Sequence, residues 1–242
     1  MSNDLLTVLV VDDEPQIRRL VRNALFNDQA LGAQPRVLEA PSGAIAIDIA
    51  AAEAPALVVL DLGLPDMDGL AVCREIRRWS DAPIIVLSAR HADTEKATLL
   101  DAGADDFVTK PFSAVELMAR VRAQLRRARG APAHGATSGA LSFAELTVDV
   151  PRRRVERGGT LLHLTPTEWS LLRAFVAHPG QTLTHRQLFH EVWGTGAGDA
   201  QQYLRVYVGH LRRKLEVDPV RPRFIHTEAG VGYRFEPDGG AA

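Results

Sequence analysis

The chain has 242 residues, a formal net charge of −2 and a single cysteine. This length suits two domains, and 46% apolar with 24% charged residues is typical of a globular protein in water. No apolar run approaches the ~20 residues that span a bilayer, and the first residues lack the pattern of a signal peptide. A single cysteine excludes an internal disulfide, and Cys73 falls on an apolar helix stripe, so we expect a packed thiol in a cytoplasmic protein.

Strand and helix patterns alternate five times in the first half of the chain. Short runs of Val, Ile and Leu predict strands, and segments of helical length separate them. The strands are predicted near 7–11, 36–40, 57–61, 84–88 and 106–109, and the helices near 15–28, 42–53, 67–79, 93–102 and 113–128. The alternation predicts an α/β domain of flavodoxin type over residues 1–128, with a five-stranded, parallel, doubly wound sheet.

Small and polar residues over 129–140 predict a flexible linker to a second domain over 141–238. Short β-type segments near 141–149 and 154–164 surround the turn Gly158–Gly159, which is a hairpin signal. Two further β-type segments, 224–227 and 233–235, flank a glycine-containing turn and predict a second hairpin near the end of the chain.

Three helices are predicted between these hairpins. Thr165 and Glu168 form a capping-box pattern before the first helix, and Thr184 and Gln187 repeat it before the second. The third helix covers about 200–216. Three helices with a terminal hairpin predict a winged helix-turn-helix.

Polar side chains stand at or just past the ends of four predicted strands in the first domain. They are Asp12 and Asp13, Asp61, Ser88, and Lys110. Because the carboxyl ends of parallel strands meet at one edge of a sheet, we expect these side chains in one crevice. Mg²⁺ prefers oxygen ligands, usually only one or two carboxylates together with water. We therefore expect Asp13 and Asp61 as direct ligands, Asp12 acting through water, and the backbone carbonyl of Gly63.

The same set predicts phosphoryl chemistry. With the cation bound, a free carboxylate oxygen of Asp61 could attack a phosphoryl group and form an aspartyl phosphate. Lys110 would stabilise the transferring oxygens, and Ser88 would donate a hydrogen bond to the product. Taken singly, each residue has an ordinary explanation, since Ser88 could cap a helix and Lys110 could be a solvated loop charge. The occurrence of all of them at the ends of separate parallel strands favours the functional interpretation.

Four segments of the first half resemble the signature segments of two-component receiver domains. They are Val10–Pro15, Leu60–Asp66, Val86–Arg90 and Gly103–Phe112. The second half is similar to the winged-helix effectors of the OmpR/PhoB family at His163–Trp169, Tyr203–Leu215 and Gly232–Phe235. Within that family, Asp61–Pro65, Leu87–Arg90 and Tyr203–Leu215 are most similar to regulators of a potassium-transport operon.

The resemblance implies phosphotransfer from the histidine of a sensor kinase to Asp61, followed by slow hydrolysis. Such self-modification would not make the chain an enzyme. It further implies a homodimer when phosphorylated, promoter DNA and RNA polymerase as partners, and a switch role for Phe107 together with Ser88. The family more often has tyrosine at the position of Phe107, and an ordinary core aromatic is the alternative interpretation.

The resemblance also implies a symmetric dimer surface on the fourth helix, fifth strand and fifth helix. The expected intersubunit pairs are Lys96–Glu116, Asp101–Arg122, and Asp105 or Asp106 with Arg120 or Arg127. An isologous interface repeats each pair twice and so multiplies small contributions.

The third helix of the second half is the expected DNA-recognition helix. Its apolar stripe is Leu204, Val208, Leu211 and Leu215, and the residues expected toward DNA are Gln202, Arg205, Val206, Gly209, His210, Arg212 and Arg213. His210 and Arg213 are the first expected base or phosphate contacts, and Val206 suits a thymine methyl. Glycine disfavours a helix by about 1 kcal/mol, so Gly209 indicates either close approach of DNA or simple tolerance.

The terminal hairpin is expected along a minor groove, with Thr227 and Arg234 near phosphates. Ala229 stands where the family often has an arginine that probes this groove.

Two other functions remain open from the sequence. A Mg²⁺-dependent phosphohydrolase could use Asp61 as its nucleophile, but it would need a nearby general acid, and only Gly63 stands two residues later. A phosphorylation-independent DNA-binding regulator could use the first domain for dimerisation alone. We favour a transcription regulator controlled by phosphorylation.

Overall fold

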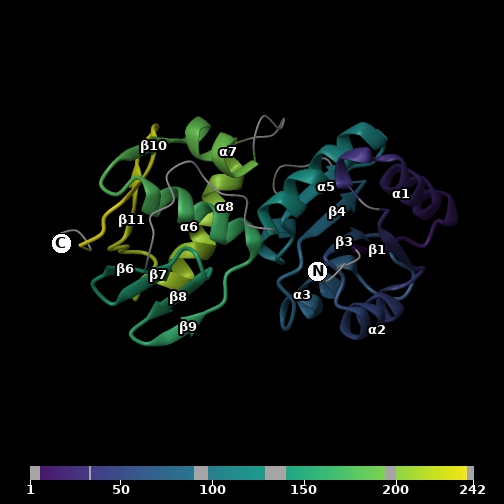
Figure 1. Ribbon diagram of the computed structural model, residues 1–242, viewed down its shortest axis with the longest axis horizontal. Helices are drawn as coiled ribbons and strands as arrows, with labels where there is room; N and C mark the ends of the chain where they lie inside the picture. The colour runs from purple at the N-terminus through teal and green to yellow at the C-terminus, as the bar shows by residue number, and fades with distance from the viewer. Residues whose placement is uncertain (1–5, 33, 90–97, 129–139, 194–199, 239–242) are drawn as a thin grey trace. The chain divides into compact units, whose positions relative to one another are not determined.

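The computed structural model describes residues 6–32, 34–89, 98–128, 140–193 and 200–238. The chain divides into two compact units, Met1–Arg129 and Gly130–Ala242 (Figure 1). The predicted linker over 129–140 falls outside the described residues except for Ala140. None of the described helices combines the length and the apolar character needed to cross a membrane.

The first unit contains the predicted five-stranded parallel sheet. Its strands are β1 (Thr7–Val11), β2 (Arg36–Ala40), β3 (Leu57–Asp61), β4 (Ile84–Ser88) and β5 (Asp106–Thr109), in the order β2-β1-β3-β4-β5. The helices are α1 (Pro15–Asn27), α2 (Gly43–Glu53), α3 (Gly69–Arg77) and α5 (Ala114–Ala128), with a short 3₁₀ helix η1 (Gln29–Leu31). Residues 98–101 are also helical, and the rest of the predicted helix over 93–102 lies outside the described residues.

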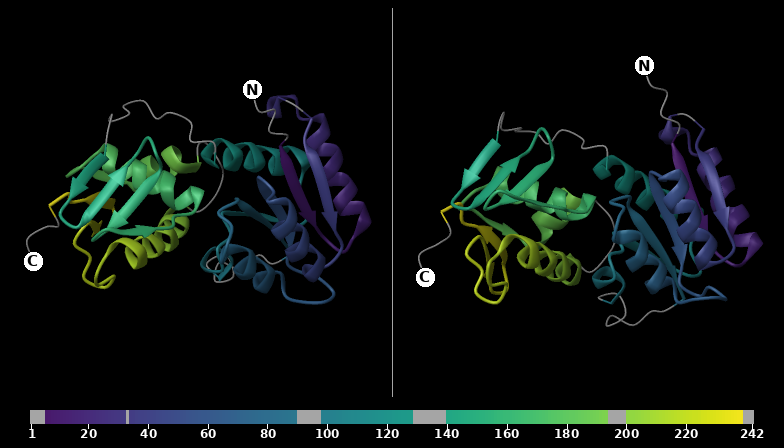
Figure 2. Two further views of the ribbon diagram at one scale, coloured as in Figure 1. Left: turned by 60° about the horizontal axis from the view of Figure 1, so that its bottom comes forward. Right: turned by 90° about the horizontal axis from the view of Figure 1, so that it is seen from below.

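Helices cover both faces of this sheet (Figure 2). Successive side chains of a strand point to opposite faces, so alternate apolar residues serve two separate layers. Val8 and Val10 of β1 pack with Val21 of α1 and Val121 of α5 in one buried cluster. The other face carries α2 and α3, where Cys73 is buried and burial raises the pKa of its thiol to about 12. The prediction of a packed thiol is confirmed.

The N-terminus of α2 is capped by a residue from a distant loop. The Ser42 side chain makes no capping hydrogen bond, whereas the Asp66 carboxylate accepts from the backbone N–H groups of Gly43 (2.8 Å) and Ala44 (2.9 Å). These hydrogen bonds lower the pKa of Asp66. Asp66 thereby ties the loop between β3 and α3 to the start of α2.

The described residues of the second unit form two antiparallel sheets and three helices. The first sheet is β6 (Ala140–Phe143), β7 (Leu146–Asp149), β8 (Arg154–Arg157) and β9 (Thr160–Leu162), in chain order. Then come α6 (Pro166–Ala177), β10 (Thr182–Thr184), α7 (His185–Trp193), α8 (Ala200–Leu215), β11 (Ile225–Glu228) and β12 (Gly232–Phe235). The predicted hairpin at Gly158–Gly159 is confirmed, since it joins β8 and β9 with both glycines at positive φ.

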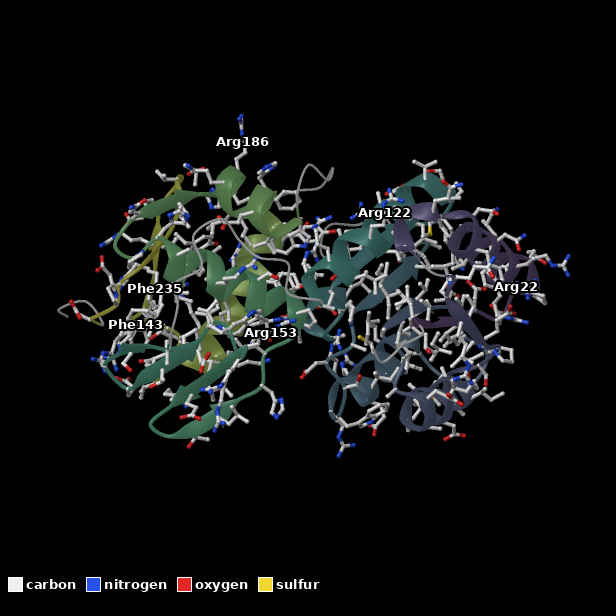
Figure 3. All side chains as sticks on the ribbon, viewed as in Figure 1. Arg22, Arg122, Phe143, Arg153, Arg186 and Phe235 are labelled. Atoms are coloured by element: carbon white, nitrogen blue, oxygen red, sulfur yellow. The ribbon has the colours of Figure 1, made fainter. Side chains whose placement is uncertain are left out.

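Sequence reasoning missed β10, which pairs with β12 at the edge of the terminal hairpin. This pairing explains Gly232, because a Cβ there would lie 2.0 Å from the carbonyl oxygen of Leu183. The two sheets are joined by Phe143 and Phe235, whose rings meet edge-to-face with centroids 5.2 Å apart (Figure 3).

Both predicted capping boxes are present. The Thr165 hydroxyl and the Glu168 carboxylate cap α6 reciprocally. At α7, the backbone N–H of Gln187 donates to the Thr184 hydroxyl (3.2 Å), and the backbone N–H of Thr184 donates to the side-chain oxygen Oε1 of Gln187 (2.9 Å).

Candidate functional site

The predicted crevice lies at the carboxyl ends of β1, β3 and β5. Lys110, just past β5, places its Nζ 2.7 Å from Asp61 Oδ1 and 2.9 Å from Asp12 Oδ2. The second oxygen of Asp61 accepts the N–H of Gly63 at 3.0 Å. A cavity of about 510 Å³ opens over these groups, and Asp13, Asp61, Ser88 and Lys110 are among its lining residues. The structure therefore brings together residues that are far apart in the chain.

Three carboxylates in this crevice are spaced for a cation. Ligand oxygens of Asp12, Asp13 and Asp61 lie within 4.8 Å of one another. Asp12 is fully buried and Asp61 is 5% exposed, whereas Asp13 is exposed. A hard, oxygen-only donor set that is open on one side suits Mg²⁺, which retains several waters when protein-bound. The residues present thus fit the expected ion.

The charges in the crevice perturb one another. Burial raises the pKa of Asp12, although the hydrogen bond from Lys110 acts in the opposite direction. Burial opposes the Lys110 charge, but hydrogen bonds to Asp61 and Asp12 outweigh it and raise the pKa of Lys110. The ammonium group is therefore held charged between two carboxylates.

Ser88 and Phe107 occupy the neighbouring strands. Ser88 ends β4, is 1% exposed and lines the same cavity as Asp61. The Lys110 N–H donates to the Ser88 carbonyl at 2.7 Å, which joins the ends of β4 and β5. Phe107 is paired with Val86 and is 8% exposed. This placement is compatible with both the switch and the core interpretation of Phe107.

Gly69 allows the loop after β3 to pack closely beneath the crevice. A Cβ at Gly69 would lie 2.4 Å from the carbonyl oxygen of Asp61 and 2.7 Å from the Cα of Leu62. Since both neighbours are backbone atoms, no side chain could be accommodated without moving Asp61.

Comparisons with known proteins agree with this architecture. Residues 8–122 match the response regulator receiver domain family, and residues 159–235 match the family described as transcriptional regulatory protein, C terminal. The KDP operon transcriptional regulatory protein KdpE of Escherichia coli is 47% identical over 96% of this chain and 99% of its own length. The chain belongs to the OmpR/PhoB family of response regulators. This is a family of transcription regulators and not of enzymes.

Other relatives support the same family. KdpE of Mycobacterium tuberculosis is 46% identical over 95% of this chain and 98% of its own length. The crystal structure of DrrB, a Thermotoga maritima OmpR/PhoB homolog, is 30% identical, covers 96% of this chain and 99% of that chain, and has a TM-score of 0.50. A mutant of RitR has a TM-score of 0.72 over 95% of this chain and 98% of its own, and at 24% identity it supports the fold alone.

The charged residues expected at the receiver dimer surface are partly paired within one protomer. Arg120 contacts Asp106 of β5 at 2.8 Å and Glu116 of α5 at 3.3 Å. Asp101 and Glu116 are exposed, whereas Arg127 is buried. Lys96 lies outside the described residues.

Within the protomer, Arg122 pairs with Asp28, which follows α1, but its side chain is still 38% exposed, so the intersubunit pair Asp101–Arg122 stays a prediction. The assignment of Asp105 to this surface is wrong. Asp105 is 1% exposed and pairs with Arg77 of α3. Asp105 therefore makes a buried ion pair within the receiver and is not accessible to a partner subunit.

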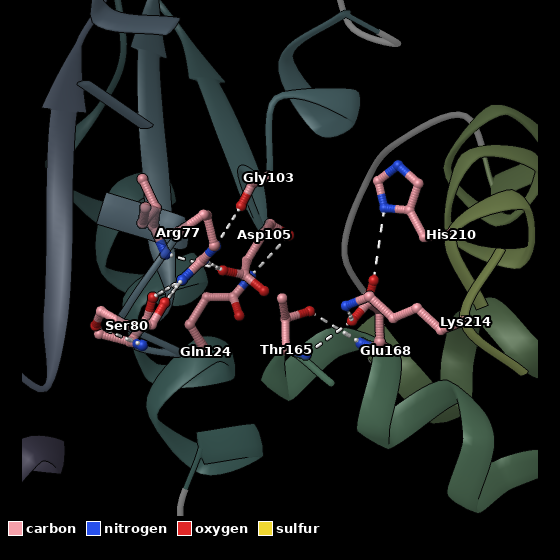
Figure 4. Close-up of polar contacts among 11 residues, drawn as sticks. Arg77, Ser80, Gly103, Asp105, Gln124, Thr165, Glu168, His210 and Lys214 are labelled. Atoms are coloured by element: carbon pink, nitrogen blue, oxygen red, sulfur yellow. Dashed lines mark hydrogen bonds and ion pairs between the residues drawn. The ribbon is translucent and has the colours of Figure 1, made fainter. Parts of the chain in front are cut away.

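Arg77, which sequence reasoning missed, connects three segments of the receiver (Figure 4). Its guanidinium donates to the carbonyls of Gly103 (2.7 Å), Ser80 (3.0 Å) and Ala82 (2.5 Å), in addition to Asp105. Gln124 of α5 donates to the Asp105 carbonyl at 3.0 Å. The network joins α3, the start of β4 and the start of β5.

The predicted buried stripe of α8 is confirmed. Leu204, Val208, Leu211 and Leu215 are at most 1% exposed. Arg205 and Arg213 are exposed, and Gln202, Val206 and Gly209 are intermediate. A Cβ at Gly209 would have no atom within 4 Å, so nothing described in the chain requires a glycine there. This leaves approach of DNA or tolerance as the reasons for it.

The expected exposed position of His210 is wrong. The residue is 9% exposed, and its Nδ1 lies 3.8 Å from the Glu168 carboxylate of α6 (Figure 4). Tyr203 and Tyr207 are also buried, so the buried arc of α8 is wider than the aliphatic stripe and reaches His210. Lys214 lies one helical turn after His210 on the same side of α8, and its Nζ contacts the Glu168 carboxylate at 2.6 Å.

Arg212 is half-buried and directed toward the wing formed by β11 and β12. Its guanidinium donates to the Ile225 carbonyl (2.6 and 2.9 Å) and to the Thr227 hydroxyl (2.8 Å). Arg234 pairs with Glu228 (2.9 Å) and with Glu236. Thr227 is exposed, as expected for a phosphate contact, whereas the Arg234 charge is already balanced within the hairpin.

Proposed function

We propose that this response regulator is phosphorylated on Asp61 by a sensor histidine kinase, dimerises through its receiver domain, and binds promoter DNA of a potassium-transport operon in the cytoplasm. The observation that carries the phosphorylation step is the contact of Lys110 with Asp61 inside a crevice of three carboxylates. The identity of 46–47% to two KdpE proteins supports the operon.

The proposed reaction transfers a phosphoryl group between side chains. An oxygen of Asp61 attacks the phosphorus of the kinase phosphohistidine, the P–N bond breaks, and its electron pair leaves with the imidazole. Asp13, Asp61 and the Gly63 carbonyl would hold Mg²⁺, with Asp12 acting through water. The bound ion would supply positive charge toward the transferring oxygens. Lys110 adds an ammonium group at the same place, because it already contacts Asp61.

The product alters the contacts of the crevice. A phosphoryl group on Asp61 adds acceptor oxygens that compete for the ammonium of Lys110 and attract the hydroxyl of Ser88. Ser88 and Lys110 are joined through their backbones, so a shift of either is transmitted to β4 and β5. Phe107 on β5 then changes its packing. The surface carrying Asp101, Asp106, Glu116 and Arg120 forms the dimer, with Lys96 as a further expected member.

The dimer would bring two effector domains to tandem half-sites. Gln202, Arg205, Val206 and Arg213 of α8 are proposed to face the major groove, and Thr227 to contact a phosphate. RNA polymerase is the proposed partner of the bound regulator.

A phosphorylation test addresses this proposal directly. Beryllofluoride with Mg²⁺ should convert the full chain to a dimer in analytical ultracentrifugation and tighten its binding to genomic fragments that include a potassium-transport promoter. Asp61→Asn should show neither response. Unchanged dimerisation and DNA affinity in the parent chain would favour phosphorylation-independent binding instead. Turnover of a small phosphoester that is lost in Asp61→Asn would favour a phosphohydrolase.

A further inference from the structure

Arg18 of α1 contacts the backbone of the segment 12–14, which follows β1 at the crevice and is called the acidic loop below. Its Nη1 donates to the carbonyl oxygen of Asp12 at 2.6 Å and to that of Asp13 at 3.1 Å. Its Nε donates to Glu39 Oε2 of β2 at 3.2 Å. The Arg18 side chain is only 14% exposed. One guanidinium therefore links α1, the acidic loop and the end of β2.

The two aspartates depend on this backbone to different degrees. The Asp12 carboxylate is held directly, by the Glu14 N–H (2.9 Å) and by Lys110. The Asp13 carboxylate receives no hydrogen bond from the residues that the structure describes. The position of Asp13 therefore follows from the path of its backbone, whose carbonyl Arg18 holds.

We infer that Arg18, oriented by Glu39, is a positioning residue for the cation site. By fixing the carbonyls of Asp12 and Asp13, it holds the Asp13 carboxylate near those of Asp12 and Asp61 before the ion arrives. This inference rests on the proposed binding of Mg²⁺ at these three carboxylates. It assigns Arg18 a role through the protein backbone, without contact to the ion.

A positioning role and a simple charge effect predict opposite results. If Arg18 acted only as a nearby positive charge, its removal would strengthen the binding of a divalent cation. If it positions Asp13, its removal weakens binding. Lysine keeps the charge but lacks the planar fork that lets arginine donate to several acceptors at once. Arg18→Lys should therefore resemble Arg18→Ala.

Arg22 provides a matched control. It lies one turn further along α1 and pairs with Glu39 Oε1 at 2.8 Å, but it makes no hydrogen bond to the acidic loop. Removing it takes away a similar charge and a similar contact to Glu39. Arg22→Ala should leave cation binding close to that of the parent chain.

The experiment is titration calorimetry of Mg²⁺ into the full, unphosphorylated chain and its variants. Loss of an outer partner of a metal ligand typically weakens affinity about 10–100-fold. We expect Kd for Mg²⁺ to rise about tenfold in Arg18→Ala and Arg18→Lys and to change less than about twofold in Arg22→Ala. Amide exchange of the Mg²⁺-free chains should show faster exchange at Asp13 and Glu14 only in the Arg18 variants.

The outcomes separate this inference from the proposed function. If the parent binds Mg²⁺ and the Arg18 variants bind it equally or more tightly, the positioning role is wrong and the site stands. Equal weakening in Arg22→Ala would also overturn it, because the effect would then come from the loss of a contact to Glu39 and not from the hydrogen bonds of Arg18 to the carbonyls of Asp12 and Asp13. A parent chain that binds no Mg²⁺ would overturn both. If Arg18→Ala does not fold, Arg18→Lys and Glu39→Gln still decide the question. Mg²⁺ binding is then measured for each variant at the same interval below its own melting temperature.

Discussion

Replacing Asp12 with asparagine should stabilise the receiver when Mg²⁺ is absent and destabilise it, relative to the parent, when Mg²⁺ is abundant. Asp12 is fully buried, and burial raises its pKa. A carboxyl whose folded pKa lies above its unfolded value opposes folding at pH values above the folded pKa. The asparagine amide keeps an acceptor for the Glu14 N–H and removes the charge. We therefore expect the variant to be more stable than the parent at neutral pH when Mg²⁺ is absent.

Mg²⁺ should reverse this order. A ligand at a hundred times its Kd stabilises the folded state by about 2.7 kcal/mol. If Asp12→Asn weakens Mg²⁺ about tenfold, the same concentration stabilises the variant by only about 1.4 kcal/mol. The parent then gains about 1.3 kcal/mol more than the variant, which opposes the variant's initial advantage and increases with the Mg²⁺ concentration.

Thermal melting of the full chain across a Mg²⁺ series measures both effects in the receiver transition. The variant should melt at a higher temperature than the parent in Mg²⁺-free buffer, and the two curves should cross as Mg²⁺ rises. Without Mg²⁺, the difference should shrink as the pH falls through the raised pKa, because Asp12 of the parent then becomes neutral. Asp13→Asn is the control, since Asp13 is exposed and should give no such gain. A variant less stable than the parent in Mg²⁺-free buffer at neutral pH would refute the reasoning.

Three further predictions concern single positions. Arg77→Ala should lower the free energy of unfolding by about 3–5 kcal/mol in denaturant titration, because it leaves the buried Asp105 carboxylate without its cation; a loss below about 1 kcal/mol would contradict this. Gly209→Ala should stabilise the effector by up to about 1 kcal/mol, since nothing described crowds a Cβ there, and weaker DNA binding by this stabilised variant would indicate close approach of DNA. Arg213→Ala should weaken DNA binding and reduce the slope of log Kd against log salt by about 1, and an unchanged slope would remove Arg213 from the phosphate contacts.

The receiver fold and the contents of its crevice were predictable because the signals are local. Each strand appears as a short apolar run, and Asp61, Ser88 and Lys110 stand at or just past the end of one. Parallel pairing alone then brings them to one edge of the sheet. The same holds for the capping boxes at Thr165 and Thr184, where the partner is three residues away.

The partners of charged side chains were harder to predict. A charge pattern shows that Arg122 and Asp105 need partners, but it does not show which of several segments supplies them. Asp28 and Arg77 satisfy these charges from 94 and 28 residues away. The predicted exposure of His210 was wrong for a related reason. The aliphatic stripe correctly predicted the centre of the buried face of α8. The width of that face depends on the aromatic side chains of α7 that pack against Tyr203 and Tyr207.

The acidic crevice combines these two kinds of information. Its reactive groups come from strand ends, where sequence and topology place them. We infer that their orientation also depends on side chains that bond to the backbone of another segment, as Arg18 does at Asp12 and Asp13; Asp66 makes the same kind of contact at the start of α2. Such contacts leave no local pattern, because a carbonyl or an N–H is present at nearly every residue. We therefore expect receivers that share the same strand-end residues to differ in cation affinity through positions such as Arg18 and Glu39, which take no part in the proposed phosphoryl chemistry.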